Sequence, residues 1–268
     1  MPLALLALTI SAFAIGTTEF VIVGLIPTIA EQLSVSLPSA GMLVSIYALG
    51  VAIGAPVLTA LTGRMPRKRL LLVLMVLFTA GNLLAWQAPG FGTLIAARLL
   101  TGLAHGAFFS IGSTIATSLV LKEKAASAIA IMFGGLTVAL VTGVPLGTFI
   151  GQHFGWRETF LAVSALGVIA LISSLILVPG TIAQRATASL REQLQVLTNP
   201  RLLIIYAITA LGYGGVFTAF TFLAPMMQDL AGFAPNAVSG ILLAYGISVA
   251  VAISGAESSP TGTVRYRP

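Results

Sequence analysis

The sequence predicts an all-α polytopic membrane protein, and three observations lead to this fold class. Only 7% of the 268 residues are charged and 57% are apolar, whereas a soluble domain carries about 25% charged residues. Apolar stretches long enough to cross a bilayer recur along the whole chain. Transmembrane β-strands would be about half as long and would alternate in polarity. A soluble globular protein and a β-barrel are therefore both excluded.

Eight apolar stretches have the length of a membrane-spanning helix, and turn or polar residues separate them. They cover residues 3–26, 40–62, 70–86, 94–121, 126–151, 159–178, 202–225 and 237–255. A cleaved signal peptide is the alternative for the first stretch, because Ala12-Phe13-Ala14 resembles a cleavage site. No basic residue precedes that stretch and apolar character resumes at Phe20, so we expect a span. The absence of Cys excludes disulfides and thiolate metal sites.

The distribution of Lys and Arg predicts the orientation. With the N-terminus in the cytoplasm, eleven of the 13 cations fall in inside segments, the outside loops hold only Arg157, and Arg98 lies within a span. This asymmetry is typical of the positive-inside rule. The net charge of +6 therefore reports topology, and we expect a lipid bilayer and no nucleic acid as its partner.

An internal repeat with an offset of 198 residues predicts two related bundles. Pro27 and Tyr47 correspond to Pro225 and Tyr245. This offset aligns the sequence of the first span with that of the seventh, and the second with the eighth. A six-helix unit repeated in the same orientation is a known transporter architecture. The predicted organisation is a six-helix bundle at 1–178, a cytoplasmic loop at 179–201, two helices of an incomplete second bundle at 202–255 and a polar tail at 256–268.

Two charged residues within spans are functional candidates, because each costs about 2.5 to 3.5 kcal/mol to insert. Glu19 and Arg98 lie at similar depth in the outer half, so they can pair if the first and fourth helices are neighbours. One interpretation is a protonatable carboxylate whose proton affinity responds to Arg98, which would serve proton coupling. The alternatives are a structural ion pair, or an Arg98 that extends to the membrane interface.

Glycines and one histidine are further candidates on the fourth and fifth spans. Gly102, His105 and Gly106 share the helix face of Arg98, so the glycines permit close helix approach and His105 is either a proton carrier or a hydrogen-bonded packing residue. The fifth span contains Gly143, Pro145 and Gly147. This composition predicts a thin, bendable helix with a role in motion, against the alternative of ordinary small-residue packing.

The loop at residues 63–69 contains four cations, Arg64, Arg67, Lys68 and Arg69. They are either an orientation signal or a latch whose cations cap helix C-terminal carbonyls or pair with carboxylates in one conformation.

These features together resemble the major facilitator superfamily, and within it the bacterial drug:proton antiporters of the arabinose-efflux and chloramphenicol-resistance-like branch. The order and helix placement of the motifs carry the resemblance, which covers about residues 2–250. The family's basic loop motif matches Leu61, Arg64, Arg67 and Lys68, whereas Thr59, Gly63 and Pro66 stand where the family has Gly, Asp and Gly. The helix 4 motif, associated with proton coupling, matches Arg98, Gly102 and Gly106. The helix 5 antiporter motif matches Gly143, Pro145 and Gly147 in part, and residues 17–20 with Pro27 resemble the first helix.

The resemblance implies a secondary transporter of the bacterial inner (plasma) membrane that exports small organic solutes of the drug or sugar type in exchange for protons. Glu19 would be the coupling carboxylate, Arg98 its modulator, and Gly102, His105 and Gly106 part of the cavity.

Family members have twelve helices, so we expect a frameshift near codon 250. The alternative function is an inactive truncated polypeptide. We expect no cofactor, metal or enzymatic activity, because no nucleophile motif or metal-ligand spacing appears, and an ATP-driven pump is disfavoured by the lack of a phosphate-binding loop.

Overall fold

The computed structural model describes residues 2–182 and 198–258, and these two ranges consist of helices joined by short connections, with no strand. The all-α fold class is therefore confirmed. The elements are α1 (Leu3–Gln32), α2 (Leu37–Leu61), α3 (Arg67–Trp86), α4 (Phe91–Ser118), η1 (Lys122–Lys124), α5 (Ala125–Val138), η2 (Ala139–Gly143), α6 (Val144–Phe154), α7 (Trp156–Leu177), α9 (Pro200–Thr221), α10 (Leu223–Pro225), η3 (Met226–Leu230) and α11 (Ala237–Ser258).

Seven helices of the described ranges are long and apolar enough to cross a membrane, and they correspond to the first seven predicted spans. The eighth prediction falls on α11, in which Ala237–Ala252 forms a shorter apolar helix. Most of the predicted loop at 179–201 and of the predicted tail beyond Ser258 lies outside the described residues.

Local chemistry explains where several helices begin. The Ser36 side chain accepts a hydrogen bond from the backbone N–H of Ser39 at the start of α2, and Asn199 does the same for Arg201 at the start of α9. Such caps satisfy N–H groups that have no partner within the helix. Gly155 separates α6 from α7 with a φ of 100°, a conformation that glycine adopts without strain.

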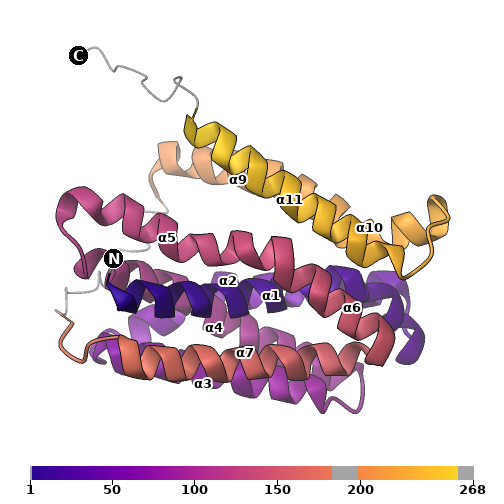
Figure 1. The fold of residues 1–268 in the computed structure, drawn as a ribbon, viewed down its shortest axis with the longest axis horizontal. Helices are drawn as coiled ribbons and strands as arrows, with labels where there is room; N and C mark the ends of the chain where they lie inside the picture. The colour runs from indigo at the N-terminus through magenta and orange to yellow at the C-terminus, as the bar shows by residue number, and fades with distance from the viewer. Residues whose placement is uncertain (1, 183–197, 259–268) are drawn as a thin grey trace.

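The longest helix, α1, lies at the centre of the bundle of α1 to α7. It packs against α2, α5, α6 and α7, and 72% of its most apolar window is buried inside the protein. Figure 1 shows α1 between α5 and α6 on one side and the α3 and α7 pair on the other. This central packing supports the interpretation of residues 3–26 as a membrane span.

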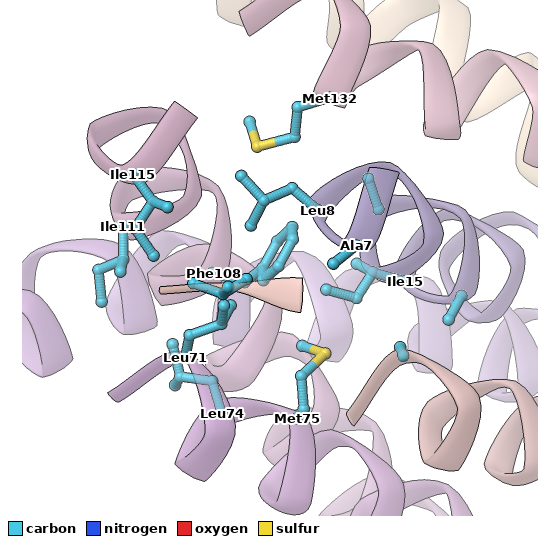
Figure 2. Packing of buried hydrophobic residues seen from close by; sticks show 14 of the residues in the cluster. Ala7, Leu8, Ile15, Leu71, Leu74, Met75, Phe108, Ile111, Ile115 and Met132 are labelled. Carbon is cyan, nitrogen blue, oxygen red and sulfur yellow. The ribbon is translucent and has the colours of Figure 1, made fainter. Parts of the chain in front are cut away.

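The core of the bundle is formed by apolar side chains from several helices that meet around Phe108. Figure 2 shows Leu8 and Ile15 of α1, Met75 of α3 and Met132 of α5 arranged around this ring. Lipid tails are as apolar as these side chains, so helix association in a membrane depends on close packing rather than on escape from water.

The helices α9 to α11 contact the bundle from its middle to one end. We call the end with the α2–α3 connection and Lys122–Lys124 the basic end, and the other the opposite end. Near the opposite end, α10 packs on α1 and α11 packs on η2 and α6. Phe220 and Leu242 are buried there, whereas Tyr206 of α9 is exposed. Figure 1 shows α9 and α11 diverging from the bundle toward the basic end.

Candidate functional site

Three helices bring together four polar side chains that we call the Glu19 cluster: Glu19 from α1, Tyr47 from α2, and Arg98 and His105 from α4. Arg98 and His105 are seven residues apart, which places them two turns apart on one face of α4. The sequence placed three of these residues among its candidates, and the structure brings those three together.

Arg98 is buried, with 1% of its surface exposed, so it does not extend to the membrane interface. Its Nη1 donates a hydrogen bond to the backbone carbonyl of Thr18 at 2.8 Å, and its Nε donates to the carbonyl of Leu43 at 3.4 Å. The guanidinium carbon lies 4.1 Å from the centre of the Tyr47 ring, a cation–π contact. The buried Nη2 has no hydrogen-bond partner among the described residues.

The Glu19 carboxyl group lies beside His105, and no ion pair joins it to Arg98 among the described residues. The contact with His105 is an ion pair only when the imidazole is protonated. Glu19 Oε2 lies 3.8 Å from His105 Nδ1, and the side chains are 20% and 11% exposed. The sequence left a Glu19–Arg98 pair possible, and its absence here has a geometric reason. The guanidinium is held by the carbonyl of Thr18, one residue before Glu19. Arg98 therefore fixes the backbone that carries the carboxylate instead of contacting the carboxylate itself.

His105 Nδ1 lies between two partners, because the Tyr47 hydroxyl is 2.9 Å from the same nitrogen. A neutral Nδ1 without a proton accepts the hydrogen bond of Tyr47. A protonated Nδ1 is a donor and favours the Glu19 carboxylate. One proton on one nitrogen therefore decides which neighbour His105 binds.

Sequence reasoning missed Tyr47, Thr18 and Asn82 as parts of this site. Thr18 Oγ1 donates to Asn82 Oδ1 at 2.6 Å, and Asn82 Nδ2 donates to the Phe78 carbonyl at 2.9 Å. These bonds fix α1 on α3 beside the carbonyl that Arg98 uses. The sequence offered only a polar side chain within an apolar span at each of these positions. An uncharged polar side chain is a weaker indication of a functional site than a charged one.

Gly102 and Gly106 lie against the backbone of α2. A methyl group at Gly102 would collide with the carbonyl oxygen of Tyr47, and one at Gly106 with that of Val51. Both glycines are buried, so they contribute close helix packing, and the structure does not show them lining a cavity.

The helix 5 candidates surround a π-helical turn. Gly143 ends η2, and Pro145 lies in the first turn of α6. Proline has no N–H and its ring crowds the carbonyl four residues earlier, which is consistent with a wider turn at this point. Gly143 packs against the Thr17 side chain of α1, and Gly147 packs against Val21. This stretch is therefore the contact of α5 and α6 with α1, two residues from Glu19.

In the basic loop, Lys68 caps a helix. Its Nζ donates to the Leu175 carbonyl at 2.8 Å, in the last turn of α7, where a cation is favoured. Capping of helix carbonyls is one of the alternatives that the sequence left open for this loop. Arg67 is buried at the start of α3, and Arg64 lies in the exposed turn before it.

No group of three His, Asp or Glu residues that could hold a metal occurs in the described ranges.

Comparison with known proteins relates the chain to a family of transporters. A profile of the Major Facilitator Superfamily matches residues 8–265. The "Uncharacterized MFS-type transporter YtbD" of Bacillus subtilis (strain 168) is 55% identical over 248 residues, which are 92% of this chain and 63% of that protein. The "Chloramphenicol resistance protein" of Streptomyces lividans is 38% identical over 252 residues, 92% of this chain and 64% of that protein. The chain thus spans just under two thirds of the length of these relatives.

The fold is similar to that of a solved transporter. The crystal structure of a bacterial homologue of the human lysosomal transporter Spinster superposes with a TM-score of 0.69, covering 91% of this chain and 58% of that one at 19% identity. The helical fold, the matched profile and the relatives lead to one conclusion. The chain belongs to the major facilitator superfamily, a family of multi-span membrane transporters.

Proposed function

We propose that this chain forms the proton-coupling part of a secondary transporter that exports small organic solutes in exchange for protons. The single observation that carries the proposal is the Glu19–His105 contact at 3.8 Å. Two groups that can exchange a proton lie side by side within a membrane-spanning bundle, and both remain partly exposed. Intramembrane ionisable residues of this kind mark proton pathways in transporters.

Arg98 supports the proposed role by holding the site in place. Its bonds to the Thr18 and Leu43 carbonyls connect α4 to α1 and α2. The buried Nη2 of Arg98 has no hydrogen-bond partner among the described residues and is free to donate. We propose that Glu19 binds His105 in one state and Arg98 Nη2 in the other, so that loss of its proton is linked to a change of partner.

The proposed cycle is alternating access, with α9 to α11 moving against the bundle. We propose that the basic end faces the cytoplasm, because eleven of the 13 Lys and Arg residues fall in sequence segments expected on the inner side. The contacts at the opposite end would then close the outer side. The proposed location is a bacterial inner membrane. Lys68 on the Leu175 carbonyl is the proposed latch at the cytoplasmic side.

The test is transport in proteoliposomes with an imposed pH gradient, with radiolabelled chloramphenicol as the first probe because one relative carries that name. Glu19→Gln keeps the size and polarity of the side chain but cannot lose a proton, so we expect uptake driven by the gradient to fall to that of empty liposomes. Glu31→Gln is the matched control, since Glu31 is an exposed acid at the end of the same helix.

The assay also separates the alternatives. Gradient-driven uptake that survives Glu19→Gln would remove Glu19 from the coupling site. If the unsubstituted chain shows no gradient-driven uptake of chloramphenicol or of other cationic and neutral drugs, it does not transport by itself, which was the second function expected from the sequence.

A further inference from the structure

A groove of about 850 Å³ lies between α3, α6 and α7, away from the Glu19 cluster. Figure 1 shows α3 and α7 on the side of the bundle that faces away from α9 and α11. The rim is apolar and exposed, with Leu83 38%, Phe154 71% and Val168 43% accessible. On this side of a spanning bundle the surrounding medium is lipid, so the groove is filled by apolar matter rather than by water.

The length of the groove matches one leaflet of a bilayer. It runs from Glu158, in the first turn of α7, to Val168. These ten residues rise about 15 Å along the helix, which is half of the roughly 30 Å hydrocarbon core. A phospholipid acyl chain with its headgroup at the end of α7 would fit this span from the interface to the middle of the membrane.

The deep part of the groove offers no free polar group. The Thr79 hydroxyl donates to the Met75 carbonyl and the Ser164 hydroxyl donates to the Phe160 carbonyl, both at 2.8 Å. Each polar side chain of the floor is thus satisfied by its own helix. These hydroxyls therefore have no proton left to donate to a solute, whereas a hydrocarbon chain needs no hydrogen-bond partner.

The mouth of the groove carries a carboxylate without a cation. Glu158 Oε1 accepts a hydrogen bond from Trp86 Nε1 at 3.4 Å, and no ion pair involves Glu158 in the described part of the chain. The neighbouring Arg157 is turned elsewhere, since its Nη2 donates to the Ala88 carbonyl at 2.9 Å and its guanidinium lies 4.3 Å from the Trp156 ring centre. The site therefore has the charge that is complementary to an ammonium group.

We infer that this groove binds one phospholipid, with an acyl chain along α7 and a primary ammonium headgroup on Glu158. A primary ammonium offers three N–H donors to the carboxylate, as in lysine. A quaternary choline offers none, and a glycerol headgroup leaves the lipid with a net negative charge beside Glu158. The inference does not depend on transport or on the Glu19 cluster.

Trp86 reports on the site, because its Nε1 donates to Glu158 at the mouth of the groove. The second tryptophan of the chain, Trp156, is two residues before Glu158 and is buried. The full chain is reconstituted in phosphatidylcholine vesicles, and tryptophan fluorescence is measured with increasing fractions of phosphatidylethanolamine, phosphatidylcholine or phosphatidylglycerol brominated on an acyl chain. Exposed ion pairs are worth up to about 1 kcal/mol, so we expect half-maximal quenching at an about two- to fivefold lower fraction of the ethanolamine lipid.

Four variants make the result decisive. Glu158→Gln keeps an oxygen for Trp86 Nε1–H and removes the charge, so the preference for the ethanolamine lipid should vanish, whereas Glu158→Asp should restore part of it. Glu31→Gln removes an exposed acid at the same end and should leave the preference unchanged. Ala165→Phe fills the groove from an exposed position and should reduce quenching by all three lipids.

Three outcomes would overturn the inference. Equal quenching by the three lipids in the unsubstituted chain would mean that no headgroup is selected, and a preference that persists in Glu158→Gln would place the selective group elsewhere. Quenching that is unchanged by Ala165→Phe, with circular dichroism showing an intact fold, would mean that the acyl chain lies outside the groove or that a second copy of the chain covers it.

Discussion

At the scale of single residues, the Nδ1 atom of His105 is the point where the Glu19 cluster can change state. It lies 2.9 Å from the Tyr47 hydroxyl and 3.8 Å from Glu19 Oε2. The atom accepts from the first partner when it is unprotonated and donates to the second when it is protonated. Arg98 is bonded to a backbone carbonyl instead of to either of these side chains.

The hydroxyl of Tyr47 should contribute measurably to stability. Tyr47→Phe keeps the ring beneath Arg98 and removes only the hydrogen bond to His105, so we expect a loss of about 1 kcal/mol in the free energy of unfolding. Denaturation in detergent micelles, followed by circular dichroism, measures this loss.

Tyr245→Phe is the control, because Tyr245 is the repeat counterpart of Tyr47. Its ring stacks on Phe220 at 4.7 Å, and that contact does not use the hydroxyl. We expect little change there, and equal losses in the two variants would show that the Tyr47 hydroxyl has no special partner.

The residues of this site that can be identified from the sequence are those whose side chains are rare within a membrane span. Glu19, Arg98 and His105 are conspicuous because charge or titratable character is costly in a membrane. Their pairing could not be predicted, because it depends on which atom of Arg98 reaches which carbonyl of α1. The sequence left a Glu19–Arg98 pair possible, and only side-chain geometry shows that His105 lies beside Glu19 instead.

At the scale of elements, the site depends on how closely α2 and α4 approach each other. Gly50 and Gly54 of α2 face Gly102 and Gly106 of α4, and a methyl group at any of the four would meet backbone atoms of the facing helix. Backbone cannot yield as a flexible side chain does, so these positions set the distance between Tyr47 and His105.

A single added methyl group at this contact should be destabilising. We expect Gly102→Ala to cost about 1–3 kcal/mol, because overpacking forces the two helices apart. The unfolding free energy in micelles measures the effect. Gly134→Ala is the matched control, since its methyl group would have open space around it and alanine favours a helix. A neutral Gly102→Ala would show that the α2–α4 contact is looser than described.

Hydropathy predicts where a span lies, but it does not predict whether the backbone forms an α-helix or a π-helical turn. The fifth span was predicted as one apolar stretch, and the structure divides it into α5, a π turn and α6. Pro145 and the glycines around it gave the signal for an irregularity. Whether the helix kinks, tilts or widens depends on neighbours such as Gly246 of α11, which packs against the carbonyl of Leu140 in that turn.

At the scale of the whole molecule, α9 to α11 are held to the bundle at the opposite end. The Gln152 side chain donates to the Pro235 carbonyl at 2.6 Å, and Phe20 of α1 contacts Phe217 and Phe220 of α9. Toward the basic end, residues such as Leu211 and Val251 are exposed. Movement of these helices as a unit therefore requires the contacts around Gln152 to open.

Cross-linking should stop this movement. The chain has no cysteine, so Gln152→Cys with Pro235→Cys introduces a unique pair. We expect a short reducible cross-linker to join the pair and to stop solute exchange across the membrane, with recovery after reduction. Ser127→Cys with Val251→Cys, on the diverging parts of α5 and α11, should link far less. Exchange that continues in the linked protein would contradict movement at this contact.

The overall architecture was the most predictable level, because it follows from composition and from hydropathy. Low charge content and recurrent apolar stretches fix an all-helical membrane fold, and the motif order indicates the family. The contact of α9 to α11 from the middle of the bundle to one end could not be predicted, because a repeat of 198 residues describes related folds and not the angle between them.

The central claim is that Glu19 exchanges the coupled proton, and equilibrium exchange tests it most directly. Radiolabelled chloramphenicol is exchanged across proteoliposomes at equal pH on both sides, and the same vesicles are then given a pH gradient. The account predicts that Glu19→Gln retains exchange and loses all stimulation by the gradient, while Glu31→Gln keeps both. Stimulation by the gradient in Glu19→Gln equal to that of the unsubstituted chain would contradict it.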